Sequence, residues 1–237
     1  MSISLSITES VAPAFDLVVV DLYRDIHKGI RSELFAATSK AGSLDPSNRV
    51  DRAALVDHVG ALAGILESHA HHEDEAIEPP LLEHLPELAE RIGADHHRLE
   101  AHFGAIVDLS SGFADVAAVD ERRLGSQLYL ELSAFTSTYL EHQLVEERVV
   151  MPALERAIGW EAALDIHQAI VGSIPPDEMA MSLAFMLPAM NVADRAELLG
   201  GVRQSAPPEV FAGVMSLAQS VLETADFTAT QARLEQG

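Results

Sequence analysis

The sequence predicts an all-α protein, an up-down-up-down four-helix bundle followed by a C-terminal helical extension. Apolar residues recur at intervals of three, four and seven along most of the chain, which is the spacing of amphipathic helices, and the alternation typical of strands is scarce. Hydrophobic residues make up 48% of the 237 residues, enough for a sizeable core. Four long helical stretches with short connections are typical of such a bundle.

The expected helices of the bundle begin and end at recognisable signals. Pro13 is a good first-turn residue for the first helix, and Ser47 or Asn48 is placed to cap the second. Two consecutive prolines separate the second helix from the third, and a Ser-Ser-Gly segment at 110–112 is expected to end the third. Pro152 is expected to be tolerated by the fourth helix or to kink it. The expected ranges, in chain order, are 13–40, 48–78, 86–110 and 120–157.

The C-terminal part of the sequence repeats itself. A Pro-Pro-acid segment at 175–177 recurs at 207–209, and an Ala-Asp pair at 193–194 recurs at 225–226, both with an offset of 32 residues. Pro-Pro followed by an acid is typical of a helix start. We expect two copies of a helix pair that pack on or beside the bundle. These helices are also the expected contact surface if the protein forms an oligomer. The expected domains are a four-helix bundle at 1–158 and a helical repeat extension at 159–237.

Composition and charge disfavour several classes of function. The formal charge of −22, from 37 acidic and 15 basic side chains, argues against partners such as nucleic acid or an anionic membrane. The sequence has no cysteine, which excludes disulfides, thiolate nucleophiles and iron–sulfur clusters. Its first residues have no basic region and no long apolar region, so we do not expect secretion, and no stretch approaches the roughly 20 apolar residues of a membrane-spanning helix. We therefore expect a cytoplasmic protein whose chemistry depends on imidazole and carboxylate groups.

One pattern points to a metal site because it occurs twice. It consists of a His, a Glu four residues later and a Pro six residues after the Glu. Residues four apart lie on one face of a helix, so the imidazole and the carboxylate project together. A carboxylate that faced the interior of a bundle would be very costly to bury without a cation. The two occurrences are His69, Glu73 and Pro79, and His142, Glu146 and Pro152.

Two further histidines complete the pattern on the neighbouring helices. His27 precedes His69 by 42 residues and His96 precedes His142 by 46, so the chain contains two helical hairpins of like design. A pseudo-twofold arrangement would bring all six side chains to one centre. Imidazole and carboxylate in this ratio suit iron, with manganese or zinc as alternatives. The six candidate metal ligands are His27, His69, Glu73, His96, His142 and Glu146.

In these motifs the sequence resembles the hemerythrin or HHE cation-binding family, over about residues 13–158. That family has a His on the first helix, His-x-x-x-Glu on the second, a His on the third and a His-carboxylate pair on the fourth. The resemblance implies a four-helix bundle and assigns the six candidates to these positions. It also implies a cofactor of two iron ions, bridged by Glu73, Glu146 and an oxo or hydroxo group.

Two departures from the oxygen-carrying hemerythrins bear on function. Those proteins have a second His four residues after the third-helix His, where this chain has Glu100. They place the fourth-helix carboxylate five residues after its His, and here both Glu146 and Glu147 are available. Whether Glu100 or Glu147 also binds metal stays open at this point. With Glu100 in place of that His, the site would have one nitrogen ligand fewer than an oxygen-carrying hemerythrin. This difference favours redox turnover over reversible oxygen carriage.

The expected function is therefore that of a non-haem di-iron protein that binds or turns over a small oxidant or diatomic ligand. The candidates are hydrogen peroxide, dioxygen and nitric oxide, and a catalase- or peroxidase-like oxidoreductase fits the missing nitrogen ligand better than transport does. The alternative is an iron- or oxygen-sensing module that signals through the C-terminal helices.

The remaining candidate residues are expected to have structural roles. Tyr23, one turn before His27, could hydrogen-bond a ligand but is interpreted as a core residue. The methionines of the repeat are interpreted as flexible core filler, namely Met179, Met181, Met186 and Met190. The other histidines are expected to lie outside the ligand set, namely His58, His71, His72, His84, His97, His102 and His167.

Overall fold

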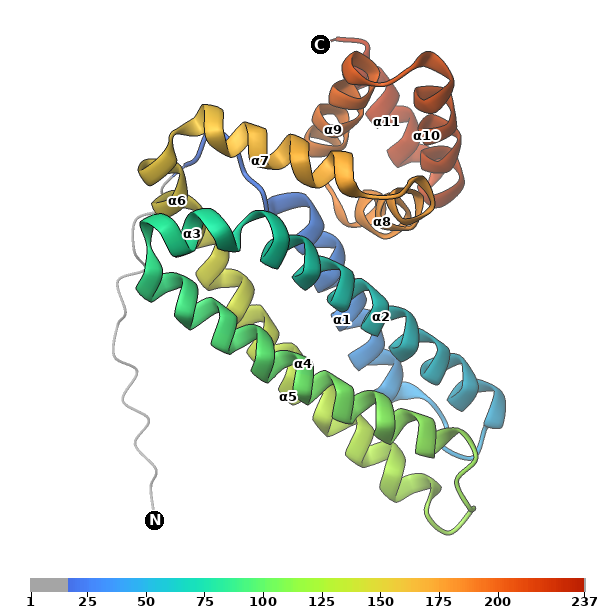
Figure 1. Cartoon of the computed structure of the whole chain (residues 1–237). Helices are drawn as coiled ribbons and strands as arrows, with labels where there is room; N and C mark the ends of the chain where they lie inside the picture. The colour runs from blue at the N-terminus through green and yellow to red at the C-terminus, as the bar shows by residue number, and fades with distance from the viewer. Residues whose placement is uncertain (1–16, 237) are drawn as a thin grey trace, which may run out of the picture.

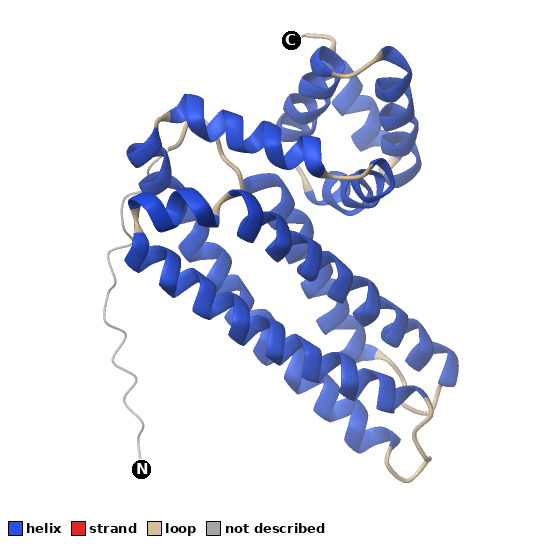
Figure 2. Cartoon of the chain, in the orientation of Figure 1, coloured by secondary structure: helices blue, strands red, loops and turns tan. Residues whose placement is uncertain are grey.

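A computed structural model describes residues 17–236, and within this range every regular element is helical (Figures 1 and 2). The bundle consists of α1 (Arg24–Ser43), α2 (Arg49–Ala76), α4 (Pro86–Ala114) and α5 (Glu121–Val145). Among the described residues, no helix combines the length and the apolar character that a membrane crossing needs.

The four bundle helices pack in a ring, in which α1 contacts α2 and α5, and α4 contacts the same two helices. Each contributes fully buried side chains to one apolar core, for example Leu34, Leu62, Ile106 and Leu132. Asn48 caps α2, because its side chain accepts hydrogen bonds from the backbone N–H groups of Val50 and Asp51. The all-helical class and the N-terminal bundle agree with the prediction.

One end of the bundle is closed by short helices, which form a second apolar core (Figure 1). α3 (Glu78–His84) follows α2 directly, with its prolines in the first turn, where no donor is needed. α5 continues through a π-helical segment, η1 (Glu146–Val150), into α6 (Met151–Ile158). α7 (Trp160–Ser173) then crosses from α6 towards the remaining helices (Figure 1).

Two expected helix boundaries are wrong. The first helix begins at Arg24, because the Asp21 side chain accepts hydrogen bonds from the N–H groups of Tyr23 and Arg24 at its start; Pro13 lies outside the described residues. α4 runs past the Ser-Ser-Gly segment to Ala114, since both serine hydroxyls bond to a backbone carbonyl of the same helix. The fourth helix runs to Ile158 and tolerates Pro152, as expected, although its winding is π-helical over Glu146–Val150.

The C-terminal helices form two pairs. The first pair is α8 (Pro176–Ala189) and α9 (Val192–Ser205), and the second is α10 (Pro208–Val221) and α11 (Thr224–Leu234). Corresponding helices begin 32 residues apart, the offset of the sequence repeat. The pairs enclose an apolar core of their own, and α8 packs against α1. The division into domains at residues 158 and 159 stays a proposal, which this separate core supports.

Candidate metal centre

The candidate site is a polar layer between the two apolar cores of the bundle. On α1, Tyr23 belongs to the core at the closed end, Ile30 belongs to the main core, and His27 lies between them. On each of the other three bundle helices the candidate ligands also lie between a residue of the main core and a residue of the core at the closed end, and the direction alternates from helix to helix. This arrangement places His69 and Glu73 between Leu66 and Ile77, His96 between Ile92 and Leu99, and His142 and Glu146 between Tyr139 and Val150.

The first half of the site comes from α1 and α2. One donor atom each from His27, His69, Glu73 and Glu146 lie within 4.8 Å of one another. The His69 Nε2 is 3.1 Å from Glu73 Oε1, and the His27 Nε2 is 3.4 Å from Glu146 Oε2. The two imidazole nitrogens are 3.2 Å apart. This half therefore presents two nitrogen and two oxygen donors to a common point.

The second half comes from α4 and α5 and uses the same two carboxylates. Its cluster consists of Glu73, His96, His142 and Glu146, again with donor atoms within 4.8 Å. The His96 Nε2 is 3.1 Å from Glu73 Oε2, and the His142 Nε2 is 3.0 Å from Glu146 Oε1. Each carboxylate thus turns one oxygen towards each pair of imidazoles. This is the arrangement that two carboxylate-bridged metal ions require.

The two shared carboxylates lack hydrogen-bond partners. Glu73 and Glu146 are buried, and none of their four oxygens has a partner of acceptable geometry within the described structure. Buried carboxylates without partners are costly, and cations bound between them would remove that cost. The donor set, four imidazole nitrogens and four carboxylate oxygens, suits iron, manganese or zinc. The residues present therefore fit a pair of metal ions.

The pKa values of the site reflect how closely these groups are packed. Burial, together with the nearby charge of Glu146, raises the pKa of Glu73 to about 7. Burial opposes ionisation of His96, but its contacts with Glu146 and Glu73 prevail and raise its pKa to about 11. Burial and the neighbouring His27 lower the pKa of His69. Without metal, protons are therefore shared unequally between the two halves.

A carboxylate outside the cluster orients His27. The His27 Nδ1 donates a hydrogen bond to Glu147 Oε1 at 3.0 Å, and Arg31 Nη1 donates to the same oxygen at 2.7 Å. A hydrogen bond at Nδ1 fixes the tautomer whose Nε2 lone pair faces the centre. The corresponding partner of His96 is Asp74, also at 3.0 Å, but the Asp74 side chain is 53% exposed.

The π-helical segment explains how two successive glutamates serve one histidine. Glu146 approaches the His27 Nε2 and Glu147 bonds its Nδ1, so adjacent residues contact opposite nitrogens of one ring. Short π-helical segments occur frequently at functional sites. The sequence left open whether Glu147 also binds metal. In the structure Glu147 lies on the outer side of His27 and belongs to neither cluster.

Two tyrosines cover the candidate ligands. The Tyr23 ring lies 5.1 Å from the ring of His27, and the Tyr139 ring lies 5.8 Å from that of His142. Both are buried. Burial, with the charges of Glu73 and Glu146, raises the pKa of both phenols, which keeps them protonated. Tyr23 packs in a core as expected, and sequence reasoning missed Tyr139.

The other candidate residues lie outside both clusters. Glu100 is exposed on α4, so the structure does not bring it to the centre. Gln143 is fully buried beside His142 with both amide atoms unpartnered, and sequence reasoning missed it. No spacing signal could have indicated it, since Gln143 belongs to neither of the repeated motifs. None of the remaining seven histidines joins a cluster among the described residues.

The family comparison agrees with this geometry. The model of the Hemerythrin HHE cation binding domain matches residues 18–157, which is more than half of the chain. The chain belongs to this family. No curated protein and no solved structure matches it at the level required for comparison.

Membership of the hemerythrin family confirms the resemblance inferred from the paired motifs. It also gives the two buried His/Glu clusters a coarse function, cation binding. The identity of the cation, the role of each candidate ligand and the small molecule that binds there are matters for proposal.

Proposed function

We propose that this hemerythrin-domain protein holds two iron ions between Glu73 and Glu146 and decomposes hydrogen peroxide there. The observation that supports this proposal is the sharing of the two carboxylates, which lack other partners and face both imidazole pairs. Under this proposal His27 and His69 bind one ion, and His96 and His142 bind the other. Glu73 and Glu146 bridge them.

The donor count favours turnover of a small oxidant over simple carriage. Each ion would receive two imidazole nitrogens and two carboxylate oxygens from the protein. Iron that prefers six ligands would keep positions for exogenous molecules on both ions. Two iron ions supply the electron transfers for the balanced reaction 2 H2O2 → 2 H2O + O2, which needs no other reductant. Dioxygen and nitric oxide are the alternative ligands for the same positions.

The chain's own residues would position the donors and limit access of water. Glu147 and Arg31 keep the Nε2 of His27 directed inward. The buried rings of Tyr23 and Tyr139 cover the ligand rings. Because their pKa values are raised, both phenols stay protonated at neutral pH and remain hydrogen-bond donors.

Metal analysis and peroxide kinetics test this proposal together. Purified protein loaded anaerobically with ferrous iron should retain about two ions per chain and release dioxygen from hydrogen peroxide much faster than the same iron free in buffer. His142→Ala should lose most of the iron. The matched control is His97→Ala, which removes an exposed imidazole next to His96 and should retain both ions. Turnover no faster than that of free iron would refute the catalytic proposal.

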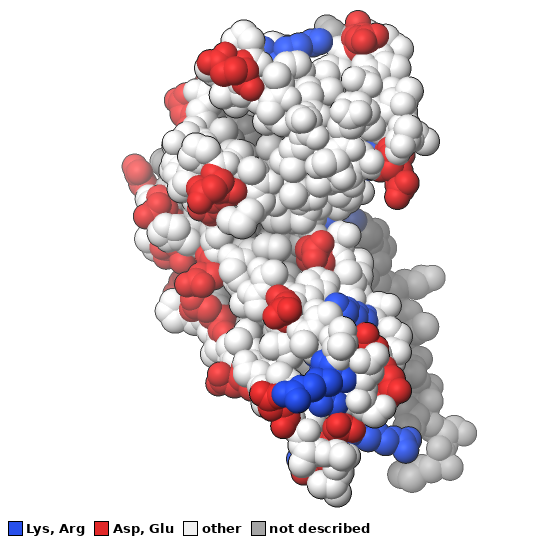
Figure 3. All heavy atoms as spheres, turned by 90° about the vertical axis from the view of Figure 1, so that its right-hand side faces the viewer, with Lys and Arg blue, Asp and Glu red and all other residues white. Residues whose placement is uncertain are grey.

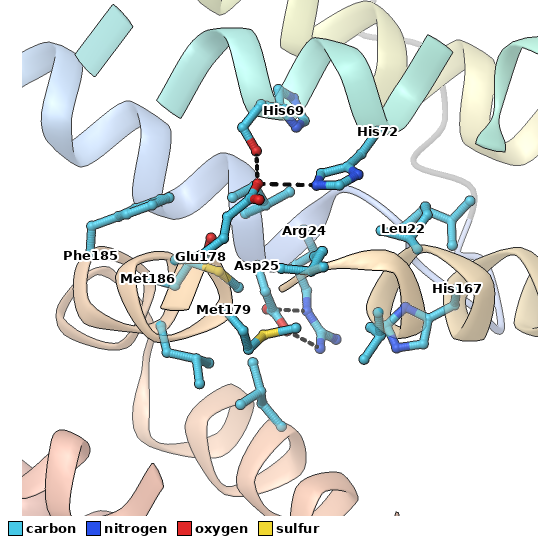
Figure 4. Close-up of a pocket in the computed structure, with 18 of the residues that line it drawn as sticks. Leu22, Arg24, Asp25, His69, His72, His167, Glu178, Met179, Phe185 and Met186 are labelled. Carbon is cyan, nitrogen blue, oxygen red and sulfur yellow. Dashed lines mark hydrogen bonds and ion pairs between the residues drawn. The ribbon is translucent and has the colours of Figure 1, made fainter. Parts of the chain in front are cut away.

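A second candidate function, iron or oxygen sensing, is supported by contacts of the C-terminal helices. Lys28, next to His27, forms an ion pair with Asp194 of α9. Glu178 of α8 accepts a hydrogen bond from Ser68, next to His69 (Figure 4). A change at these two ligands would therefore reach α8 and α9 directly. Hydrogen exchange of α8–α11 should slow when iron binds; identical exchange with and without iron would exclude this function.

A further inference from the structure

A large cleft separates the bundle from the C-terminal helices. Its volume is about 2610 Å³, and its walls come from α1 and α2 on one side and from α7, α8 and α9 on the other. His69 and Glu73 belong to its lining. Figure 4 shows His72 of α2 facing Glu178 of α8, while the ring of His69 points away from α8 into the bundle. The cleft therefore borders the first half of the candidate metal centre.

The metal-side wall of the cleft contains two glycines that packing does not explain. Gly60 and Gly64 are four residues apart on one face of α2, and a Cβ at either would meet no atom within 4 Å. Gly inside a helix costs about 0.5–1 kcal/mol relative to Ala. At Gly29 on α1, in contrast, Phe185 would lie 2.6 Å from a Cβ, so close packing explains that glycine. Gly60 and Gly64 leave space in the cleft.

Glu73 belongs both to the lining of the cleft and to the six candidate metal ligands. It lines the cleft, it is 6% exposed, and both of its carboxylate oxygens lack a hydrogen-bond partner. Both oxygens are themselves buried, so a molecule in the cleft would lie beside the Glu73 side chain and would reach its carboxylate only through a local movement of the cleft wall. A water-sized molecule needs only about 30 Å³. Hydrogen peroxide alone does not account for a cleft of this size.

The opposite wall is largely apolar and adaptable. Met179, Phe185 and Met186 of α8 point into the cleft (Figure 4). Met190 is buried in the C-terminal core and Met179 and Met186 pack against it, as expected. Met181 also lines the cleft but is 63% exposed, so the expectation of core filler is wrong for Met181. Methionine side chains are flexible and polarisable, and they suit surfaces that accept apolar molecules of varied shape.

The charges of the cleft disfavour anions. Eleven acidic and three basic side chains line it, and acidic side chains are also prominent on the neighbouring surface shown in Figure 3. The three basic residues are already paired, Arg24 with Asp25, Lys28 with Asp194 and Arg31 with Glu147. No cation of the described lining is left to hold a carboxylate, and the surrounding negative field repels one.

We propose that the cleft binds an uncharged, apolar organic hydroperoxide and directs its –OOH group towards His69 and Glu73. This inference rests on the proposed function and names a second substrate class for the same centre. The overall reaction is 2 ROOH → 2 ROH + O2, which balances without an added reductant. In each molecule the O–O bond breaks, the organic group keeps one oxygen as a hydroxyl, and the two released oxygens leave as dioxygen.

Binding of an unreactive analogue tests the cleft without relying on turnover. The probe is 2-phenyl-2-propanol, the alcohol of cumene hydroperoxide, and 4-isopropylbenzoate is an anion of similar size. Binding to the full-length protein, with and without iron, is measured by calorimetry and ligand-detected NMR. The alcohol should bind at least about 10-fold more tightly than the anion, because the cleft opposes negative charge.

A pair of glycine variants localises that binding. Gly64→Phe places a ring in the cleft and should weaken alcohol binding by about 10-fold or more. Gly104→Phe is the matched control, since Gly104 is an exposed glycine of α4 with nothing within 4 Å of its Cβ position and no part in the cleft. Equal alcohol affinity in the two variants, or an anion that binds as tightly as the alcohol, would overturn the inference.

Kinetics with two peroxides separate this inference from the proposed function. In the iron-loaded Gly64→Phe variant, dioxygen release from cumene hydroperoxide should fall while release from hydrogen peroxide persists. If the wild type decomposes hydrogen peroxide but not cumene hydroperoxide, the cleft inference fails alone. If it decomposes neither, yet binds the alcohol in the cleft, the proposed function fails, and with it the hydroperoxide as substrate.

Discussion

The two halves of the candidate centre share their donors but differ in their surroundings. His27 and His69 lie beneath the C-terminal helices and the cleft, and Glu147 with Arg31 supports His27 from a largely shielded position. His96 is supported by Asp74, which is largely open to solvent. The repeated motif therefore produced two like sets of donors, and later segments of the chain made them inequivalent. One half can respond to a bound molecule or to the C-terminal helices independently of the other.

The largest expected effect comes from a residue that belongs to both halves. Glu146→Ala should abolish binding of both ions, because Glu146 presents an oxygen to each imidazole pair. Iron content after loading measures this. Circular dichroism should show an intact fold, since the change removes an unpartnered buried carboxylate. Glu100→Ala, which removes an exposed carboxylate, should retain two ions. Two ions retained by Glu146→Ala would contradict the shared site.

The outer carboxylates should show the inequivalence directly. Glu147→Gln should lower metal affinity by about 10–100-fold, because it weakens the support of His27. Asp74→Asn should have a smaller effect, since water competes for the exposed Asp74 side chain. Competition with a chelator measures both affinities. A larger loss for Asp74→Asn than for Glu147→Gln would reverse the comparison.

The packing of α8 on α1, above the first half of the centre, depends on Gly29. Gly29→Ala should destabilise the protein by about 1–3 kcal/mol, because the new methyl group meets the Phe185 ring and the α8 backbone. The free energy of unfolding in urea measures this. Gly104→Ala, at an open position, should instead stabilise by about 0.5–1 kcal/mol. A stabilising Gly29→Ala would mean that α8 does not pack this closely on α1.

The smallest expected difference between the two halves is in how the stability of the metal-free protein depends on pH. The pKa of His96 is about 11 in the folded state, against an ordinary value of 6.5, so its proton stabilises the fold fully below pH 6.5 and progressively less as pH rises towards 11. Between pH 7 and 9 the free energy of unfolding should fall by at most about 1.4 kcal/mol per pH unit.

Above pH 7 the other shifted carboxyl and imidazole groups of the site contribute little to the slope. The raised pKa of Glu73 makes stability fall with pH up to about 7, and the lowered pKa of His69 makes stability rise up to 6.5. The lowered pKa values of Glu146 and Glu147 make stability rise only in the acidic range. Urea titrations at several pH values measure the slope above pH 7. His96→Gln should remove it, as should bound iron. A slope that survives in His96→Gln would assign it elsewhere.

The sequence predicted the parts of the centre that depend on local spacing. His69 with Glu73, and His142 with Glu146, are four residues apart, and helix geometry alone places each pair on one face. The two lone histidines, His27 and His96, could be assigned because the hairpins repeat. The structure brings all six side chains together, and their assignment as ligands stays a proposal.

The features that the sequence did not predict depend on contacts between distant segments. The support of His27 by Glu147 joins residues 120 apart in the chain. The start of α1 at Arg24 depends on Asp21 and on Glu155 of α6, whose carboxylate accepts hydrogen bonds from Val19 and Val20. The cleft arises only where α8 meets α1 and α2. Periodicity contains no information about such contacts.

The π-helical turn at Glu146–Val150 contains one residue more than an α-helical turn would. Loss of a single codon there would restore regular helical winding and leave the residues after it close to their present orientation, because the turn itself absorbs the extra residue. Glu155 would keep its hydrogen bonds to the backbone of Val19 and Val20, whereas the contacts of Glu146 and Glu147 with opposite nitrogens of His27 would be disturbed. A one-residue deletion in this turn should therefore impair the metal centre more than the fold.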